Sequence, residues 1–345
     1  MNKIKVACLF GGCSSEYDVS LVSATSVIRN LNKEKYDVTL IGITKDGDFY
    51  LYDGDIDRIE IDEWFDLDDV KKITFSTNRS DHGFIVLDTN ELHKVDIVLP
   101  ILHGKNGEDG TLQGVFELTG IPYIGCDMTS SAICMDKFLA HELVRLNGIR
   151  VPKTYLFDKK EDNILEKIKD LDYPIFVKPL KAGSSFGITK VMEESELKNA
   201  IALAFAYDDK IIIEEGIDGF EVGCAILGNK DLKIGEVDEI ELEDGFFDYE
   251  EKYTLKTSSI HLPAKISKEE RERIKGLALK IYQILGCTGF ARVDMFYTKN
   301  KEIVFNEVNT IPGCTSHSRY PSMLKEVGYE FSDIIDEWIR LGLER

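Results

Sequence analysis

The chain lacks an excess of basic residues. Of its 345 residues, 42 are Lys or Arg and 62 are Asp or Glu, which gives a formal net charge of -20. A surface that binds nucleic acid or an anionic membrane needs clustered cations. The composition therefore excludes both as partners, but it allows a phosphate-bearing small molecule in a locally basic pocket.

Paired cysteines and long apolar runs are also missing. The seven cysteines are scattered and include no C-x-x-C pair, so neither a disulfide framework nor a zinc site is indicated. No apolar run approaches the ~20 residues of a membrane span. The first apolar run ends at Gly11 and Gly12 without a cleavage pattern, which predicts a strand rather than a signal peptide. We expect a cytoplasmic protein with buried free thiols.

The common nucleotide-binding fingerprints are absent too. The first glycine turn, residues 11–16, is not G-x-G-x-x-G, and no G-x-x-x-x-G-K-[ST] occurs. Strands over 4–10 and 38–43 around a helix over 19–31 nevertheless predict the start of a doubly wound α/β domain. Ligands bind such folds at the carboxyl ends of the strands, where Glu16 lies. The alternative for Glu16 is an ordinary acid at a helix N-terminus.

A second loop, residues 103–110, follows an apolar strand over 95–102 and contains three glycines. This placement predicts a loop that faces a ligand. Its His103 is a candidate site residue, with a purely structural histidine as the alternative. Residues 46–92 predict short hairpins that carry no recognisable chemistry.

The middle of the chain predicts a smaller unit with helices over 130–146 and 161–171 and strands over 155–157 and 174–179. After Lys178, a Gly/Ser loop over 182–187 joins two strands and can offer backbone N–H groups to phosphates. The alternative is a plain flexible hairpin. An exposed helix lysine is likewise the alternative for Lys137. Glu214 and Glu221 lie where a second domain meets a third.

Two strands near the C-terminus, 290–296 and 303–309, predict a hairpin. If Phe296 pairs with Ile303, one face of the hairpin gathers a cation, two carboxylates and an amide. Hard oxygen donors of this kind suit Mg²⁺ when substrate phosphates complete its shell. A solvated face with ordinary ion pairs is the alternative. The four side chains are Arg292, Asp294, Glu307 and Asn309.

Two loops flank this hairpin in the sequence. Residues 241–259 show no periodicity and predict a lid, in which Lys252 and Tyr253 are the groups most suited to chemistry. Residues 310–321 follow Asn309 directly and suit anion recognition. Amphipathic helices are predicted over 267–285 and 331–341.

Six segments, taken in order, resemble the D-alanine–D-alanine ligase family of the ATP-grasp superfamily, over essentially the whole chain. Residues 245–249 and 315–321 make it most similar to the VanG-type D-alanine–D-serine ligases of that family. The resemblance implies an α/β fold with an N-terminal domain over 1–126 and two ATP-clasping domains over 127–216 and 217–345, the last with a lid over 241–260. The six segments are 11–21, 102–114, 178–187, 248–253, 292–294 and 306–313.

The resemblance also implies cofactor sites. ATP would lie between the second and third domains, and Mg²⁺, with Mn²⁺ as a substitute, would be held by Asp294, Glu307 and Asn309. The residues expected to contact the nucleotide or its phosphates are Lys137, Lys178, Ser184, Ser185, Glu214, Glu221, Lys252 and Asn306.

For the chemistry, the resemblance implies that Glu16 binds the ammonium of the first D-alanine, whose carboxylate attacks the γ-phosphate of ATP. The amine of the second D-amino acid then attacks the acyl phosphate. Arg292 and the N–H of Gly313 would stabilise the oxyanion. Ser318 would bind the second carboxylate. A hydrogen-bonded set would close the lid and exclude water; it consists of Glu16, Ser184 and Tyr253.

Arg319 departs from the D-alanine–D-alanine pattern, which usually has Leu at this position. Arginine stays charged and offers five N–H donors, so it can bind a serine hydroxyl. The alternative is a rim arginine paired with a carboxylate. We therefore expect D-alanine and D-serine as substrates and a homodimer. The competing hypotheses are a D-alanine–D-alanine ligase and a non-catalytic nucleotide-binding regulator.

Overall fold

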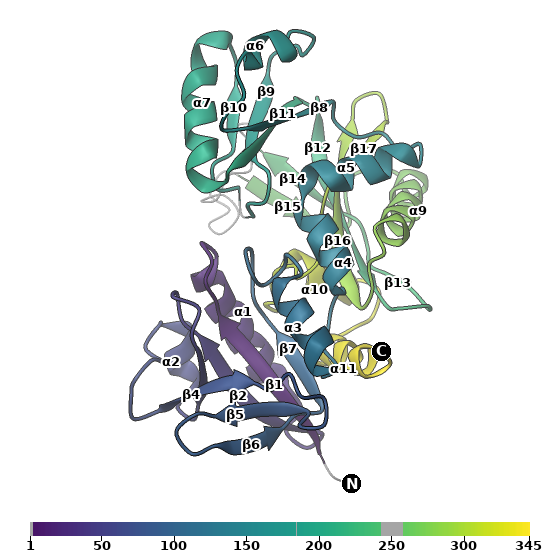
Figure 1. Cartoon of the computed structure of the whole chain (residues 1–345). Helices are drawn as coiled ribbons and strands as arrows, with labels where there is room; N and C mark the ends of the chain where they lie inside the picture. Colours follow the sequence, from purple (N-terminus) through teal and green to yellow (C-terminus); the bar gives the residue numbers. More distant parts are fainter. Residues whose placement is uncertain (1–2, 184, 243–257) are drawn as a thin grey trace.

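The computed structural model describes residues 3–183, 185–242 and 258–345, and within them the strands form three sheets (Figure 1). The N-terminal sheet lies at the bottom of the view, the middle sheet at the top, and the third sheet between them on the right. Within the described residues, no helix is both long and apolar enough to cross a bilayer. The division of the chain at residues 126 and 216 stays a prediction.

The N-terminal sheet has the strand order β6-β5-β4-β3-β2-β1-β7. Strand β1 pairs in parallel with β2 and β7, and β3 to β6 form the predicted antiparallel hairpins at one edge. The strands are β1 (Ile4–Gly11), β2 (Tyr36–Ile43), β3 (Phe49–Tyr52), β4 (Val70–Phe75), β5 (Gly83–Val86), β6 (Glu91–Lys94) and β7 (Ile97–Pro100).

Helices cover both faces of this sheet because side chains alternate along β1. Cys8 and Phe10 pack in the core that contains α1 (Tyr17–Asn30) and α11 (Phe331–Leu343), whereas Ala7 and Leu9 pack in the core that contains α3 (Thr111–Thr119). The short α2 (Ile56–Glu60) packs beside α1. The predicted doubly wound α/β fold is therefore confirmed.

The middle sheet is antiparallel, with the order β10-β9-β11-β8, and α7 packs against it. The helix predicted over 161–171 is only α6 (Ile164–Lys167). It cannot begin earlier because Asn163 before it adopts a left-handed backbone with φ of 63°. The other elements are β8 (Thr154–Asp158), β9 (Ile175–Pro179), β10 (Thr189–Val191), α7 (Glu194–Tyr207) and β11 (Lys210–Glu215).

The helix predicted over 130–146 is two helices, α4 (Met128–Met135) and α5 (Lys137–Leu146). Asp136 separates them with an extended backbone, and its side chain accepts the N–H of Leu139 at 3.0 Å as the N-cap of α5. The break places Lys137 at the first turn of α5, where it is buried rather than solvent-exposed.

The third sheet has the order β15-β14-β12-β16-β17, with β13 paired to β12. Along β12, Val222 and Cys224 face the core that includes α9, whereas Ala225 and Leu227 face the core that includes α10 and α11. The elements are β12 (Gly219–Leu227), β13 (Lys233–Ile234), β14 (Asp238–Leu242), β15 (Ser258–His261), α9 (Lys268–Ile284), β16 (Phe290–Thr298), β17 (Ile303–Asn309) and α10 (Arg319–Lys325).

Candidate active site

The β16–β17 hairpin has a register different from the predicted one. Tyr297 pairs with Ile303, so the expected pairing of Phe296 with Ile303 is wrong. A bulge then shifts the register between Asp294 and Met295. Without that shift, the partner of Asp294 would be Asn306, and Glu307 would point to the opposite face of the sheet.

Asn306 is the extra residue of this bulge, because Met295 lies opposite Phe305 and Asp294 lies opposite Glu307. Its backbone carbonyl accepts a hydrogen bond of 2.8 Å from Nε2 of His141 on α5, which anchors the bulge. The bulge therefore brings Glu307 and Asn309 to the face that carries Asp294.

Asp294 is the buried centre of this face, with 1% of its surface exposed. Arg292 donates to both of its oxygens, from Nε at 2.8 Å and from Nη2 at 2.7 Å, and Asn309 donates from Nδ2 at 2.8 Å. Burial opposes the charge of the guanidinium, but Asp294 outweighs this effect and raises the pKa of Arg292. Arg292 is thus an ion-pair partner of Asp294, and its contact with an oxyanion stays a prediction.

The donor set of the hairpin fits a magnesium ion. Asp294 and Glu307 are directly opposite each other, and two like charges in such a pair destabilise a sheet unless a cation balances them. Lys137 Nζ lies 3.7 Å from Oε2 of Glu307. In the described part of the chain, no three Asp, Glu, His or Cys side chains form a metal cluster. The predicted third ligand is the amide of Asn309, and phosphate oxygens would complete such a shell.

The predicted phosphate-binding lysines come from two elements. Lys178 on β9 forms a buried ion pair with Glu214 on the neighbouring β11. Lys137 donates from Nζ to the carbonyl of Ala182 at 2.8 Å, at the start of the Gly/Ser loop. Ser185 in that loop has a left-handed backbone, with φ of 58°. Both lysines therefore border this loop, and their contacts with phosphate stay predictions.

Glu16 is buried between two loops that are far apart in the sequence. A Cβ atom added to Gly104 would lie 2.3 Å from Glu16 Oε2, and one added to Gly183 would lie 2.4 Å from the same oxygen. Both loops can approach the carboxylate only because these positions are glycines. Glu16 thus lies where the N-terminal sheet meets the Gly/Ser loop.

His103 and Glu108 both form hydrogen bonds with the backbone of Ile311, in the loop after β17. His103 bonds to the carbonyl of Ile311, and Glu108 bonds to its N–H. His103 Nδ1–H donates to the carbonyl of Ile311 at 3.0 Å, and Nε2 accepts from the hydroxyl of Ser23 at 2.9 Å. Burial lowers the pKa of His103 to about 4, so the ring is neutral. This gives His103 two protein partners, and a direct contact with substrate stays a prediction.

Glu108 is a site residue that the sequence did not single out. Its Oε1 accepts the N–H of Ile311 at 2.9 Å, and its Oε2 accepts the N–H of Gly104 at 2.8 Å. Burial and the charge of Glu16 raise the pKa of Glu108 to about 8. Three acids, from positions 16, 108 and 307, therefore influence one another across the junction of the two sheets.

Gly313 and Ser318 are close to each other in the loop that Ile311 begins. A Cβ on Gly313 would lie 3.0 Å from Ser318 Oγ, and the same oxygen accepts the N–H of Thr315 at 3.1 Å. The loop is therefore folded tightly around Ser318. The predicted roles of Gly313 and Ser318 stay predictions.

Arg319 is buried, with 9% of its side chain exposed. It donates to both oxygens of Asp238, from Nε at 2.6 Å and Nη2 at 2.8 Å, and from Nη1 to Glu221 at 2.6 Å. Asp294 Oδ1 lies 3.7 Å from Nη2. Asp238 was missed by sequence reasoning because nothing in its neighbourhood marks it. The predicted roles of Glu221 toward the nucleotide and of Arg319 toward serine stay predictions.

Three predicted residues, Ser184, Lys252 and Tyr253, lie outside the described residues. The hydrogen-bonded set expected between Glu16, Ser184 and Tyr253 and the nucleotide contact expected for Lys252 therefore stay predictions.

Two family models match this chain, and its curated relatives cover its whole length. The D-ala D-ala ligase N-terminus model matches residues 5–126, and the D-ala D-ala ligase C-terminus model matches residues 143–340. The chain is 47% identical to the vancomycin B-type resistance protein VanB of Enterococcus faecalis, covering all of both chains.

Two solved structures share the fold. The VanG D-Ala:D-Ser ligase of Enterococcus faecalis is 55% identical, with a TM-score of 0.92 over 99% of this chain and all of that one. The D-alanine–D-alanine ligase of Bacillus anthracis, complexed with ATP, is 30% identical, with a TM-score of 0.75 over 99% of this chain and 98% of that one. The resemblance seen in the sequence is confirmed: the chain has the ATP-grasp fold and belongs to the D-alanine–D-alanine ligase family of ATP-dependent ligases.

Proposed function

We propose that the chain joins D-alanine to D-serine at the expense of ATP, through a D-alanyl phosphate. The observation that carries the proposal is the 55% identity with the VanG D-Ala:D-Ser ligase, maintained over 99% of this chain. The dipeptide would enter peptidoglycan precursors in the cytoplasm and reduce sensitivity to vancomycin.

In the first step, the ammonium of D-alanine binds at buried Glu16, and its carboxylate attacks the γ-phosphorus of ATP. The bond to the β,γ-bridging oxygen breaks, so ADP leaves and an acyl phosphate forms. Lys137 and Lys178 border the Gly/Ser loop and supply positive charge to the phosphates. Mg²⁺, when bound by Asp294, Glu307 and Asn309, would neutralise further phosphate charge.

In the second step, the amine of the acceptor attacks the acyl carbon, and phosphate leaves as the amine loses a proton. Arg292 binds Asp294 through Nε and Nη2, which directs Nη1 away from that carboxylate. This nitrogen and the N–H of Gly313 would donate to the oxyanion of the tetrahedral intermediate. Ser318 would donate to the acceptor carboxylate.

Arg319 would select serine. Its pairing with Asp238 and Glu221 uses three of the five N–H donors of a guanidinium. The other two can serve a serine hydroxyl, and a site built for a hydroxyl discriminates against the analogue that lacks it. Asp238 would hold the guanidinium in the orientation that this requires.

The test measures phosphate release and dipeptide identity with ATP, Mg²⁺ and D-alanine, with and without D-serine. We expect D-alanyl-D-serine as the main product when both amino acids are present. Equal or faster turnover with D-alanine alone would support the second candidate, a D-alanine–D-alanine ligase, which the match to the Bacillus anthracis ligase favours. No turnover with either would favour a nucleotide-binding regulator.

The Arg319→Leu variant tests the specificity step separately. We expect it to lose the preference for D-serine and to keep phosphate release with D-alanine. A variant that still prefers D-serine would remove Arg319 from the explanation.

A further inference from the structure

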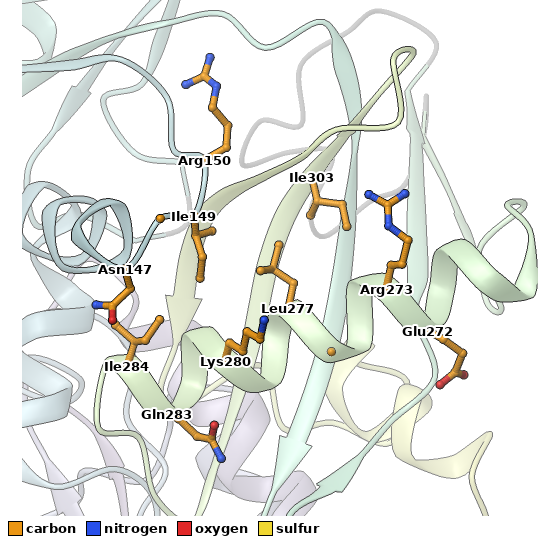
Figure 2. A pocket seen from close by; sticks show the side chains of 12 residues that line it. Asn147, Ile149, Arg150, Glu272, Arg273, Leu277, Lys280, Gln283, Ile284 and Ile303 are labelled. Carbon is orange, nitrogen blue, oxygen red and sulfur yellow. The ribbon is translucent and has the colours of Figure 1, made fainter.

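Two hollows of the described surface differ in their relation to the candidate active site. A groove of about 850 Å³ lies between α9 and residues 147–150, and none of the described residues that line it is a predicted site residue (Figure 2). A smaller cavity of about 320 Å³ includes Tyr17, the residue directly after Glu16. It is also lined by Lys45, Asp62 and Trp64. The smaller cavity therefore adjoins the carboxylate that we propose for the first substrate.

The turn that carries Glu16 is closed by local bonds. The N–H of Glu16 donates to Oγ of Ser14 at 3.1 Å, and the N–H of Tyr17 donates to the carbonyl of Ser14 at 3.2 Å. Such short-range bonds fix the shape of a turn but not its place relative to the rest of the fold. Since α1 begins at Tyr17, the place of Glu16 depends on how this first helical residue is held.

Tyr17 is held by its hydroxyl from two sides. The O–H donates to Oδ1 of Asp62 at 2.8 Å, and the oxygen accepts from the Nε1–H of Trp64 at 2.8 Å. Both partners follow α2 in the chain, 45 and 47 positions beyond Tyr17. Burial raises the pKa of Tyr17 well above its ordinary value, so the hydroxyl keeps the proton that it donates. These bonds tie the start of α1 to a distant segment.

The two partners of Tyr17 are themselves fixed. Trp64 is fully buried against β2, where a Cβ added to Gly42 would lie 2.3 Å from the indole ring. Asp62 has a left-handed backbone with φ of 57°, a conformation that persists only where the surroundings impose it. Lys45 Nζ lies 3.0 Å from Oδ2 of Asp62 and 4.4 Å from the centre of the Tyr17 ring. Tyr17 is therefore tied to groups that cannot easily shift.

We propose that Tyr17 is a positioning residue, which fixes the carboxylate of Glu16 for the ammonium of the first substrate. It does so through its hydrogen bonds with Asp62 and Trp64. The inference rests on the proposed function, which assigns that ammonium to Glu16. Residues 46–92, in which the sequence indicates no chemistry, would thus support the substrate site from behind.

Glu16 needs such support because it has little freedom to shift. A Cβ added to Gly104 or to Gly183 would lie 2.3 or 2.4 Å from Oε2 of Glu16, so the backbones of two loops already close on the carboxylate. A binding group must be held within about 0.5 Å of its productive place by neighbours that are themselves fixed. Loss of the bonds of Tyr17 should therefore weaken the binding of the first substrate and leave the acceptor site unchanged.

The test is steady-state kinetics of the whole chain, with D-alanine varied at saturating ATP and D-serine. We expect Tyr17→Phe to raise KM for D-alanine about fivefold, the effect of one lost hydrogen bond, and to leave kcat and KM for D-serine within about twofold. Asp62→Gly tolerates the left-handed backbone and should act like Tyr17→Phe. Asp62→Asn keeps an acceptor for the hydroxyl and should recover most of this loss. Tyr17→Phe combined with Asp62→Gly should raise KM no further than either change alone.

Tyr36→Phe is the matched control. Tyr17 and Tyr36 are each 6% exposed, and the hydroxyl of Tyr36 also donates to an aspartate, Asp336 at 2.7 Å, which Lys35 binds as well. Tyr36 lies at the amino end of β2, whereas the turn of Glu16 follows the carboxyl end of the neighbouring β1. The control should lower the thermal midpoint by an amount similar to Tyr17→Phe and leave KM for D-alanine unchanged.

Glu16→Gln separates this inference from the proposed function. If Glu16→Gln raises KM for D-alanine and Tyr17→Phe does not, only the positioning role fails. If Glu16→Gln leaves that KM unchanged, the proposed role of the carboxylate fails, and the inference fails with it. An equal rise in KM for D-serine, or the same rise in KM for D-alanine with Tyr36→Phe, would indicate a general loss of structure and would also overturn the proposal.

Discussion

Replacing Glu108 by glutamine tests how the junction between the first and third sheets responds to pH. Two backbone N–H groups favour the ionised carboxylate, yet burial and the charge of Glu16 outweigh them and raise the pKa from 4.5 to about 8. The folded chain therefore holds this proton more tightly than the unfolded chain does. Between pH 4.5 and 8, each unit of rising pH should lower the free energy of unfolding by up to about 1.4 kcal/mol.

Glutamine has nearly the same shape and does not titrate, so this pH-dependent loss should disappear in Glu108→Gln. Over two pH units the free energy of unfolding can fall by at most about 2.7 kcal/mol. Because Glu108 is only partly buried, we expect the unmodified chain to lose about 1–2.5 kcal/mol of it between pH 5.5 and 7.5. A separate cost, independent of pH, arises because the amide NH₂ of glutamine faces one of the N–H groups that Glu108 accepts.

The measurement is denaturant unfolding of the ligand-free whole chain at pH 5.5, 6.5 and 7.5. Glu269→Gln, on the exposed side of α9, is the matched control and should give a curve parallel to that of the unmodified chain. The reasoning is refuted if the free energy of unfolding of Glu108→Gln changes with pH in parallel with that of the unmodified chain. In that case Glu108 is ionised throughout, and the two N–H groups dominate.

Three further predictions concern the site itself. Gly104→Ala should raise KM for the first D-alanine at least about tenfold in a steady-state assay, because the added Cβ would meet Glu16 Oε2. Gly148 has a similar positive φ, and a Cβ added to it has nothing within 4 Å. Gly148→Ala in the same assay therefore controls for backbone strain. Asp238→Asn should destabilise the fold by about 3 kcal/mol or more, since Arg319 stays buried and loses an ionised partner, and product analysis should show weaker selection of D-serine. Removing divalent metal with EDTA should abolish phosphate release, and Mg²⁺ or Mn²⁺ should restore it; activity that persists without metal would contradict the proposed role of the hairpin.

Local pattern predicted most of the elements around the site, but not their register. The alternation along 290–296 and 303–309 identified both strands of the hairpin and the face that carries Asp294. It could not show the bulge at Asn306, because a bulge is selected by its surroundings, here by the hydrogen bond from His141 on α5. The predicted convergence was right although the predicted pairing was wrong.

Contacts between residues that are distant in the sequence could not be predicted for a similar reason. Glu108 bonds to Ile311, 203 positions away, and Arg319 bonds to Asp238, 81 positions away. No spacing rule connects such residues, and loop carboxylates such as Glu108 are usually solvated. A rim arginine paired with a carboxylate was the alternative for Arg319; the pairing is observed, but the arginine is buried, and the sequence offered many acids and no means to choose among them.

Repulsion among the carboxylates of this site favours the binding of cations. Burial and the charges of Glu16 and Glu307 raise the pKa of Glu108, so these two charges oppose the ionisation of Glu108. A substrate ammonium at Glu16 or a metal ion at Glu307 would remove part of this repulsion and lower the pKa of Glu108. Binding should therefore release a proton from Glu108 near pH 7.5. The negative charge left on the carboxylate would strengthen the hydrogen bond that it accepts from the N–H of Ile311. The substrate's own charge would in this way tighten the loop that contains Gly313, whose N–H we propose as a donor to the oxyanion.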